Sequence, residues 1–155
     1  IIDAMDLLYT GTFSGFCLVS SDSDFTRLAA RLREAGKLVI GFGERKTSKS
    51  LVAACDRFIY TDVLRSEAGG AAPSAPKDLS ADKELMALLR EAIDAASDDS
   101  GWAYLGGVGS NVQKRAPDFD SRNYGRKRLS DLIAAIDAFE FDRAKNRVRV
   151  RERKS

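Results

Sequence analysis

Hydrophobic residues in the first 64 positions form short apolar runs separated by amphipathic segments. Three of the runs predict buried strands, at residues 15–20, 38–42 and 57–60. Three segments with helical spacing of their apolar residues predict helices, at residues 1–9, 24–35 and 48–54. Because short apolar strands separated by helices are typical of a parallel sheet buried on both faces, we expect an α/β unit over residues 1–64.

The pattern changes at residues 65–80, which are rich in Ala, Gly, Pro and Ser and predict a flexible linker. Beyond it, apolar residues at helical spacing predict three helices, at residues 83–96, 109–115 and 124–138. The stretch FEFDRAKNRVRVRERK predicts two strands around a polar turn, with Val148 and Val150 facing the core. The glycine-rich residues 106–110 lack the lysine of a P-loop and are interpreted as a turn. Three helices followed by a hairpin indicate an α+β winged helix-turn-helix over residues 81–155.

The composition is that of a packed protein, since 44% of the 155 residues are hydrophobic and 31% are charged. The sequence shows no apolar run as long as a membrane span and no signal-peptide pattern, so we expect no membrane partner. Cys17 and Cys55 lie among apolar residues and predict buried free thiols rather than a disulfide, which favours the cytoplasm. The lack of histidine leaves carboxylates, lysine, hydroxyls or an oxygen-held metal ion for any catalysis.

Two carboxylates directly follow the first predicted strand. Asp22 and Asp24 lie at its carboxyl end, the edge of a parallel sheet where ligands bind. Their oxygen atoms suit Mg²⁺ or Mn²⁺, and they suit capping of the next helix equally well. Asp3 lies on a helix that we expect to run antiparallel to the strand and to begin near the same edge; the alternative is a solvated helix acid. Asp56 precedes the third strand, at the opposite edge, and is interpreted as structural.

Residues 1–62 resemble the C-terminal part of an NYN domain. The resemblance is carried by DAMDLL, VSSDSDF, REAGKLVIG and AACDRFI. It implies a Rossmann-like, PIN-like sheet whose acids bind Mg²⁺ or Mn²⁺ and cleave RNA. Asp22 and Asp24 match the acids at the family's strand end, and Asp3 matches an acidic position on the preceding helix. The family's first strand carries a further acid that is not in this sequence, and we therefore expect an N-terminally truncated domain.

Positive charge is concentrated in the C-terminal third, with a net charge of +6 over residues 114–155 against 0 over 1–64 and −4 over 81–113. Such a patch indicates contacts to nucleic-acid phosphates, and a solvated polar face is the alternative. The candidate RNA-binding residues are Lys114, Arg126, Lys127, Arg128, Arg147, Arg149 and Arg151. Three aromatic residues are candidates for base stacking, with core packing as the alternative, namely Trp102, Tyr104 and Tyr124.

Residues 83–152 resemble an OST-HTH/LOTUS domain, through WAYLGGVGSNV, PDFDSRNYG and KRLSDLI followed by FEF. That family is a winged helix-turn-helix that binds RNA and in some members binds proteins, and in bacteria it often follows an NYN domain. Together, the two resemblances imply a metal-dependent ribonuclease joined to an RNA-binding module. The alternative is a non-catalytic RNA-binding or protein-docking protein.

Overall fold

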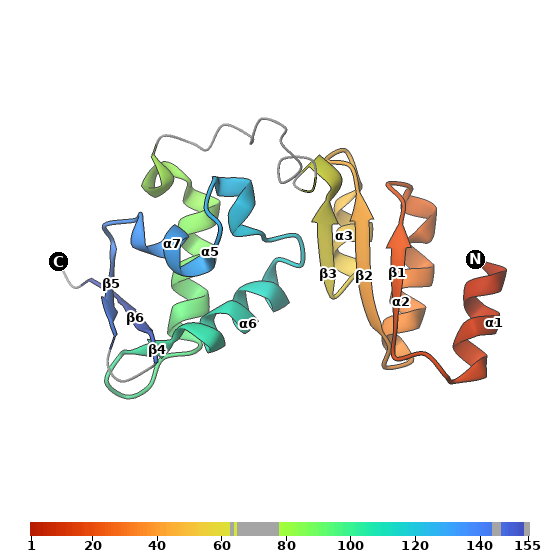
Figure 1. Cartoon of the computed structure of the whole chain (residues 1–155), viewed down its shortest axis with the longest axis horizontal. Coiled ribbons are helices and arrows are strands. Elements are labelled where there is room, and N and C mark those ends of the chain that lie inside the picture. The colour runs from red at the N-terminus through yellow and green to blue at the C-terminus, as the bar shows by residue number, and fades with distance from the viewer. Residues whose placement is uncertain (63, 65–77, 144–146, 154–155) are drawn as a thin grey trace. The chain divides into compact units, whose positions relative to one another are not determined.

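The computed structural model describes residues 1–62, 64, 78–143 and 147–153. They form two compact units, one with a parallel sheet and one with helices and an antiparallel sheet (Figure 1). Most of the predicted linker, residues 65–77, lies outside the described residues. Its last residues enter the short helix η2 (Leu79–Ala81), where Leu79 is buried in the core of the second unit. None of the helices in the described part of the chain combines the length and the apolar character that a membrane crossing needs.

The first unit alternates helices and strands, as the apolar runs predict. Its elements are α1 (Ile2–Thr10), β1 (Gly15–Val19), η1 (Ser23–Phe25), α2 (Thr26–Glu34), β2 (Leu38–Gly43), α3 (Lys49–Ala54) and β3 (Arg57–Tyr60). The strands are parallel in the order β1-β2-β3, with Cys17 opposite Ile40 and Phe42 opposite Ile59. The predicted α/β class is therefore confirmed for this unit.

One face of this sheet is buried and the other is partly exposed. Helices α2 and α3 contribute Leu28, Leu32 and Leu51 to the core beneath the sheet. On the other face Val19 is 76% exposed and Leu38 is 52% exposed. The prediction of a sheet buried on both faces is therefore wrong for these residues.

The two cysteines are both free, as predicted, but they differ in exposure. Cys55 is fully buried, whereas Cys17 is exposed, which corrects the prediction of two buried thiols. Cys17 alternates along β1 with Phe16 and Leu18, which pack against the core, so it points to the other face. Burial raises the pKa of the Cys55 thiol to about 11.

Phe58 of β3 packs directly over the backbone of β2. A Cβ atom at Gly41 would lie 2.5 Å from a ring carbon of Phe58 and 2.9 Å from the sulfur of Cys55. Phe58 itself is 2% exposed. The core of the first unit therefore requires glycine at position 41, where the ring approaches the strand too closely for any side chain.

Asp56 anchors the amino edge of the sheet. Its carboxylate accepts a hydrogen bond from the N–H of Val39 at 2.8 Å and forms an ion pair with Arg33 at 3.0 Å. The guanidinium of Arg33 also donates to the carbonyl of Ala53. Asp56 thus links β2, β3 and α2, and its predicted structural role is confirmed.

The second unit has the predicted winged helix-turn-helix architecture. Its elements after η2 are α5 (Lys83–Asp94), β4 (Ala103–Tyr104), α6 (Leu105–Arg115), η3 (Ser121–Tyr124), α7 (Leu129–Ala134), β5 (Phe139–Asp142) and β6 (Arg149–Glu152). The sheet is antiparallel in the order β4-β6-β5, and its strand β4 is too short for sequence periodicity to reveal. The helices and the sheet enclose a core that includes Leu85, Leu89, Val108, Val112, Leu132, Ile133 and Val150.

Two helices of this unit differ from the prediction. Helix α6 begins at Leu105, so the glycine-rich residues 106–110 are helical and not a turn. Burial of Val108 and Val112 overrides the low helix propensity of glycine. A Cβ at Gly107 would lie 3.4 Å from the side chain of Ala96, an ordinary packing contact with the residues that follow α5.

Helix α7 has six residues rather than the predicted span of 124–138. Gly125 has a φ of 70° and ends the η3 turn, and Arg128 is extended, so residues 125–128 lie outside the helix. Left-handed backbone at glycine ends helical turns in this way. The basic residues expected to open this helix instead form the loop before it.

Candidate functional site

The predicted acidic pair lies on the loop after β1. Asp22 is the N-cap of η1, and its Oδ1 accepts a hydrogen bond from the N–H of Asp24 at 3.0 Å. The N–H of Asp22 in turn donates to the hydroxyl of Ser20. Both acids are exposed, and the carboxylate of Asp24 makes no hydrogen bond or ion pair with another described residue. Capping by Asp22 thus uses one oxygen and leaves its Oδ2 and the carboxylate of Asp24 for a ligand.

Asp3 lies in the first turn of α1 and is exposed. Helix α1 runs opposite to β1, so its first turn is at the end where β1 stops (Figure 1). Within the described residues, however, no three acids or cysteines come together in a group that could hold a metal ion. The structure therefore does not bring Asp3 together with Asp22 and Asp24, and the metal-binding roles of all three stay predictions.

Two further acids follow strands at the same edge of the sheet. Glu44 comes directly after β2 and its N–H donates to the hydroxyl of Ser21 at 2.8 Å, which ties the two loops together. Asp62 follows β3 and accepts a hydrogen bond from Arg45 at 2.7 Å. One oxygen of Asp62 is buried without a hydrogen-bond partner in the described structure. The rule that identified Asp22 also finds these acids, since each follows an apolar strand.

The second unit presents a basic loop before α7. Arg126, Lys127 and Arg128 are consecutive and exposed, and none forms an ion pair with another described residue. Lys114, in the last turn of α6, is also exposed and makes no such pair. These four predicted RNA contacts therefore keep their charges available to a ligand.

The turn that precedes this loop is held rigidly by a salt bridge. Arg122 donates from Nε and Nη2 to the two carboxylate oxygens of Asp120, at 2.9 and 2.7 Å. Asp120 also caps η3 by accepting from the N–H of Arg122. A bidentate pair of this geometry is among the stronger ionic contacts in proteins, and it fixes the chain on which the basic loop is mounted.

The arginines of the hairpin have a different environment. Arg149 pairs with Asp142 and Arg151 pairs with Glu140, each directly across the β5–β6 ladder. Both guanidinium groups also lie over the ring of Trp102, at 5.5 and 4.5 Å from its centroid. Their charges are therefore balanced within the hairpin, and Trp102 serves as their packing surface.

Arg147 and Tyr104 form a separate pair at the edge of the sheet. The Arg147 guanidinium lies 5.6 Å from the centre of the Tyr104 ring. The third candidate aromatic, Tyr124, packs against Phe119 with their ring centres 6.0 Å apart. Of the three candidate aromatic side chains only Tyr104 is exposed, to 45%.

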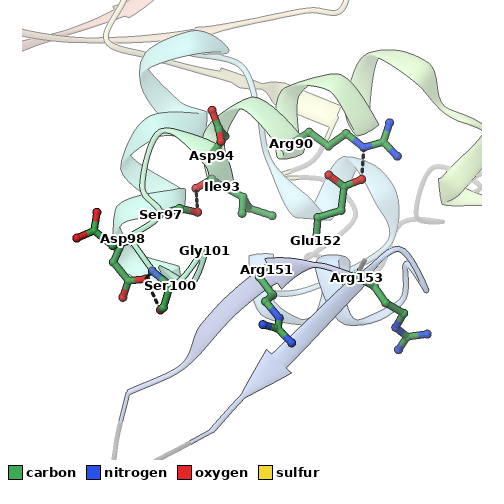
Figure 2. A pocket seen from close by; sticks show the side chains of 11 residues that line it. Arg90, Ile93, Asp94, Ser97, Asp98, Ser100, Gly101, Arg151, Glu152 and Arg153 are labelled. Carbon is green, nitrogen blue, oxygen red and sulfur yellow. Dashed lines mark hydrogen bonds and ion pairs between the residues drawn. The ribbon is translucent and has the colours of Figure 1, made fainter. Parts of the chain in front are cut away.

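A hollow of about 650 Å³ lies between the end of α5 and β6 (Figure 2). Its rim is mixed in charge, because Asp94 and Asp98 face it together with the ion pair of Arg90 and Glu152. Hydrogen bonds from the Ser100 hydroxyl, and from backbone N–H groups, hold the pKa of Asp98 below its usual range. Arg151 and Arg153 also line the hollow, so acids and cations alternate around it and it offers no uniformly basic surface to phosphate.

Comparisons with known proteins agree with this two-unit architecture. The NYN domain matches residues 1–64, and the OST-HTH/LOTUS domain matches residues 80–150. One similar solved structure is the solution NMR structure of an uncharacterized protein of Nitrosomonas europaea, whose sequence is 34% identical to this chain. The match covers 56% of this chain and 87% of that protein's chain, with a TM-score of 0.43. None of the curated proteins compared with the chain matches it.

The two matched domains carry different chemistry. NYN is a nuclease-type domain that is generally metal-dependent, and OST-HTH/LOTUS is an RNA-binding domain. Their order along the chain is the one that its motifs predict. The chain therefore belongs to the proteins that carry an NYN domain followed by an OST-HTH/LOTUS domain.

Proposed function

We propose that this chain binds RNA through its second unit and that its first unit contributes to a metal-dependent ribonuclease. The observation that carries the proposal is the basic loop before α7, where Arg126, Lys127 and Arg128 are exposed and unpaired with other described residues. Phosphate contacts of winged helices usually come from the region of the third helix and from the wing. Lys114 adds a fourth available charge.

The acids after β1 fit the divalent ion that this function implies. Asp22 and Asp24 are exposed carboxylates at the carboxyl edge of a parallel sheet, and three of their four oxygens make no hydrogen bond to a described residue. Mg²⁺ is commonly held by one or two carboxylates together with waters and substrate phosphates. Asp22 and Asp24 would hold the ion, with Asp3 as a further candidate. When bound, such an ion activates water and stabilises charge on the phosphate.

RNA binding is tested by titrating the full chain with a labelled single-stranded RNA over a series of salt concentrations. We expect the logarithm of the affinity to fall linearly with the logarithm of salt concentration. Replacing the three cations of the basic loop by alanine should reduce that slope by about 3. The matched control replaces three exposed, paired cations by alanine, namely Arg31, Lys46 and Arg90, and should leave the slope unchanged. An affinity that does not respond to salt would contradict the proposal.

Metal binding is tested separately from cleavage. Titration of the chain with Mn²⁺, followed calorimetrically, should show binding that is weakened in Asp22→Asn and in Asp24→Asn. Cleavage of the same RNA in the presence of Mn²⁺ should fall in both variants. If the wild type and both variants bind Mn²⁺ equally, Asp22 serves only as a cap and Asp24 holds no ion, and the chain is an RNA-binding protein without this metal site.

A further inference from the structure

The side chain of Tyr104 is placed where a ligand can reach it. Tyr104 ends β4 and is 45% exposed, although the neighbouring residue Ala103 is fully buried. Trp102, two residues earlier, is covered by two arginines that are themselves paired with acids. Tyr104 therefore offers the accessible aromatic surface of this sheet.

Arg147 gives this surface a positive charge that is not balanced by a carboxylate. It is exposed, and its guanidinium lies 5.6 Å from the Tyr104 ring centre without an ion pair to any described residue. Arg149 and Arg151, on the same strand region, are each matched by an acid. Among Arg147, Arg149 and Arg151, Arg147 is the one able to meet a phosphate without first giving up an internal partner.

Tyr104 and Arg147 border a hollow of about 370 Å³. Leu105, Gly106 and Val148 complete its lining, and the N–H of Leu105 donates to the carbonyl of Val148 at 3.0 Å, which joins the two segments that line the hollow. A Cβ atom at Gly106 would meet nothing within 4 Å. Packing therefore does not require glycine there, and its missing side chain leaves open space beside the tyrosine ring.

We propose that Tyr104 and Arg147 form a stacking site for one unpaired nucleotide of single-stranded RNA. The inference rests on the RNA binding proposed above and names the form of RNA that this site takes. An exposed ring stacks on the face of any base, and such stacking tolerates sequence. Bases inside a duplex have their faces covered by neighbours, so the site selects single strands. Arg147 lies over one face of the ring, so the base stacks on the opposite face while the guanidinium contacts the adjoining phosphate.

The test uses the full chain and a single-stranded RNA of about 10 nucleotides that contains 2-aminopurine, whose fluorescence is quenched when it stacks. We expect quenching on binding, and we expect Tyr104→Phe to retain it because the ring remains. Tyr104→Ala should abolish the quenching and weaken binding about fivefold to 150-fold. Arg147→Ala should reduce the salt slope by about 1. Tyr9→Ala, at an exposed tyrosine of the first unit, is the matched control and should leave the quenching, the affinity and the salt slope unchanged.

The outcomes separate this inference from the proposed function. RNA binding with no quenching, or with an unchanged affinity in Tyr104→Ala, would overturn the stacking site and leave RNA binding intact. Equal affinity for a duplex of the same sequence would overturn the selection of single strands. A chain that binds no RNA at any salt concentration would overturn the proposed function as well.

Discussion

Substituting alanine for Gly41 should destabilise the first unit, although the same substitution at an unstrained glycine usually stabilises a protein. The added Cβ would lie 2.5 and 2.8 Å from two ring carbons of Phe58 and 2.9 Å from the sulfur of Cys55. Contacts below 3 Å cannot persist, so the ring or the strand must move. Phe58 is 2% exposed, so any movement of its ring displaces neighbouring buried side chains.

The expected size of the effect follows from two opposing contributions. Forcing an additional carbon into a packed core costs about 1–3 kcal/mol. Alanine also has less backbone freedom than glycine in the unfolded chain, which stabilises the folded state by about 0.4–1 kcal/mol. With the middle of each range, Gly41→Ala should therefore lower the free energy of unfolding of this unit by about 1.3 kcal/mol. With a typical urea dependence, the midpoint moves down by roughly 1 M.

Two spectroscopic probes distinguish the units in a urea titration. The sequence contains one tryptophan, Trp102, and it lies in the second unit, so its fluorescence follows unfolding of that unit. Far-UV circular dichroism follows both. Gly41→Ala should move the dichroism transition of the first unit to lower urea concentration and leave the fluorescence transition of the second unit in place. Gly106→Ala is the control, because its Cβ meets nothing within 4 Å and should leave stability equal or about 0.5–1 kcal/mol higher.

A double variant tests the stated cause. Replacing Phe58 by leucine in the Gly41→Ala background gives the new Cβ more room. The double variant should therefore lose less free energy of unfolding than the two single variants, Gly41→Ala and Phe58→Leu, lose in sum. Additive effects would show that the ring is not what opposes the Cβ. An unchanged or raised stability of Gly41→Ala alone would refute the reasoning altogether.

Four further predictions concern other parts of the chain. At about pH 8, a maleimide should label Cys17 rapidly and Cys55 only after denaturation, as peptide mass spectrometry would show. In the folded chain the pKa of Cys55 is raised from 9.0 to about 11, so the stability that the buried neutral thiol contributes is complete below pH 9 and is lost as pH rises to 11. In urea titrations, the free energy of unfolding of Cys55→Ala should therefore fall less between pH 9 and 11 than that of the wild type. Asp56→Ala should lower the free energy of unfolding by about 1–3 kcal/mol and Asp56→Asn by less, measured by the same titration. Asp142→Asn should release Arg149, raise RNA affinity and steepen the salt slope by about 1 in a filter-binding series.

Sequence patterns were sufficient to place the helices and strands of the first unit, because each has a local signal, but not to show that one sheet face and Cys17 are exposed. The apolar runs ending at Val19 and Tyr60 became strands, and Ser48 caps α3 where the helical spacing starts. The position of Asp22 at the carboxyl edge followed from topology alone. Glu44 and Asp62 could have been found by the same rule, since each follows a strand.

The second unit was harder to predict because tertiary contacts decide its details. Helix α6 starts among glycines only because its two valines are buried, and no local pattern reports that burial. The pairing of Arg149 with Asp142 joins residues brought together by the register of the hairpin. A run of arginines in the sequence therefore indicated more available charge than the folded hairpin offers.

The uncovered face of the first sheet has a consequence for handling the protein. Among the described strands, β1 lies at the end of the order β1-β2-β3, and it carries the exposed Val19 and Cys17. An edge strand with apolar side chains is a template on which another chain can add a strand. Self-association that grows with protein concentration would begin here, and a lysine at position 19 would act as a gatekeeper against it.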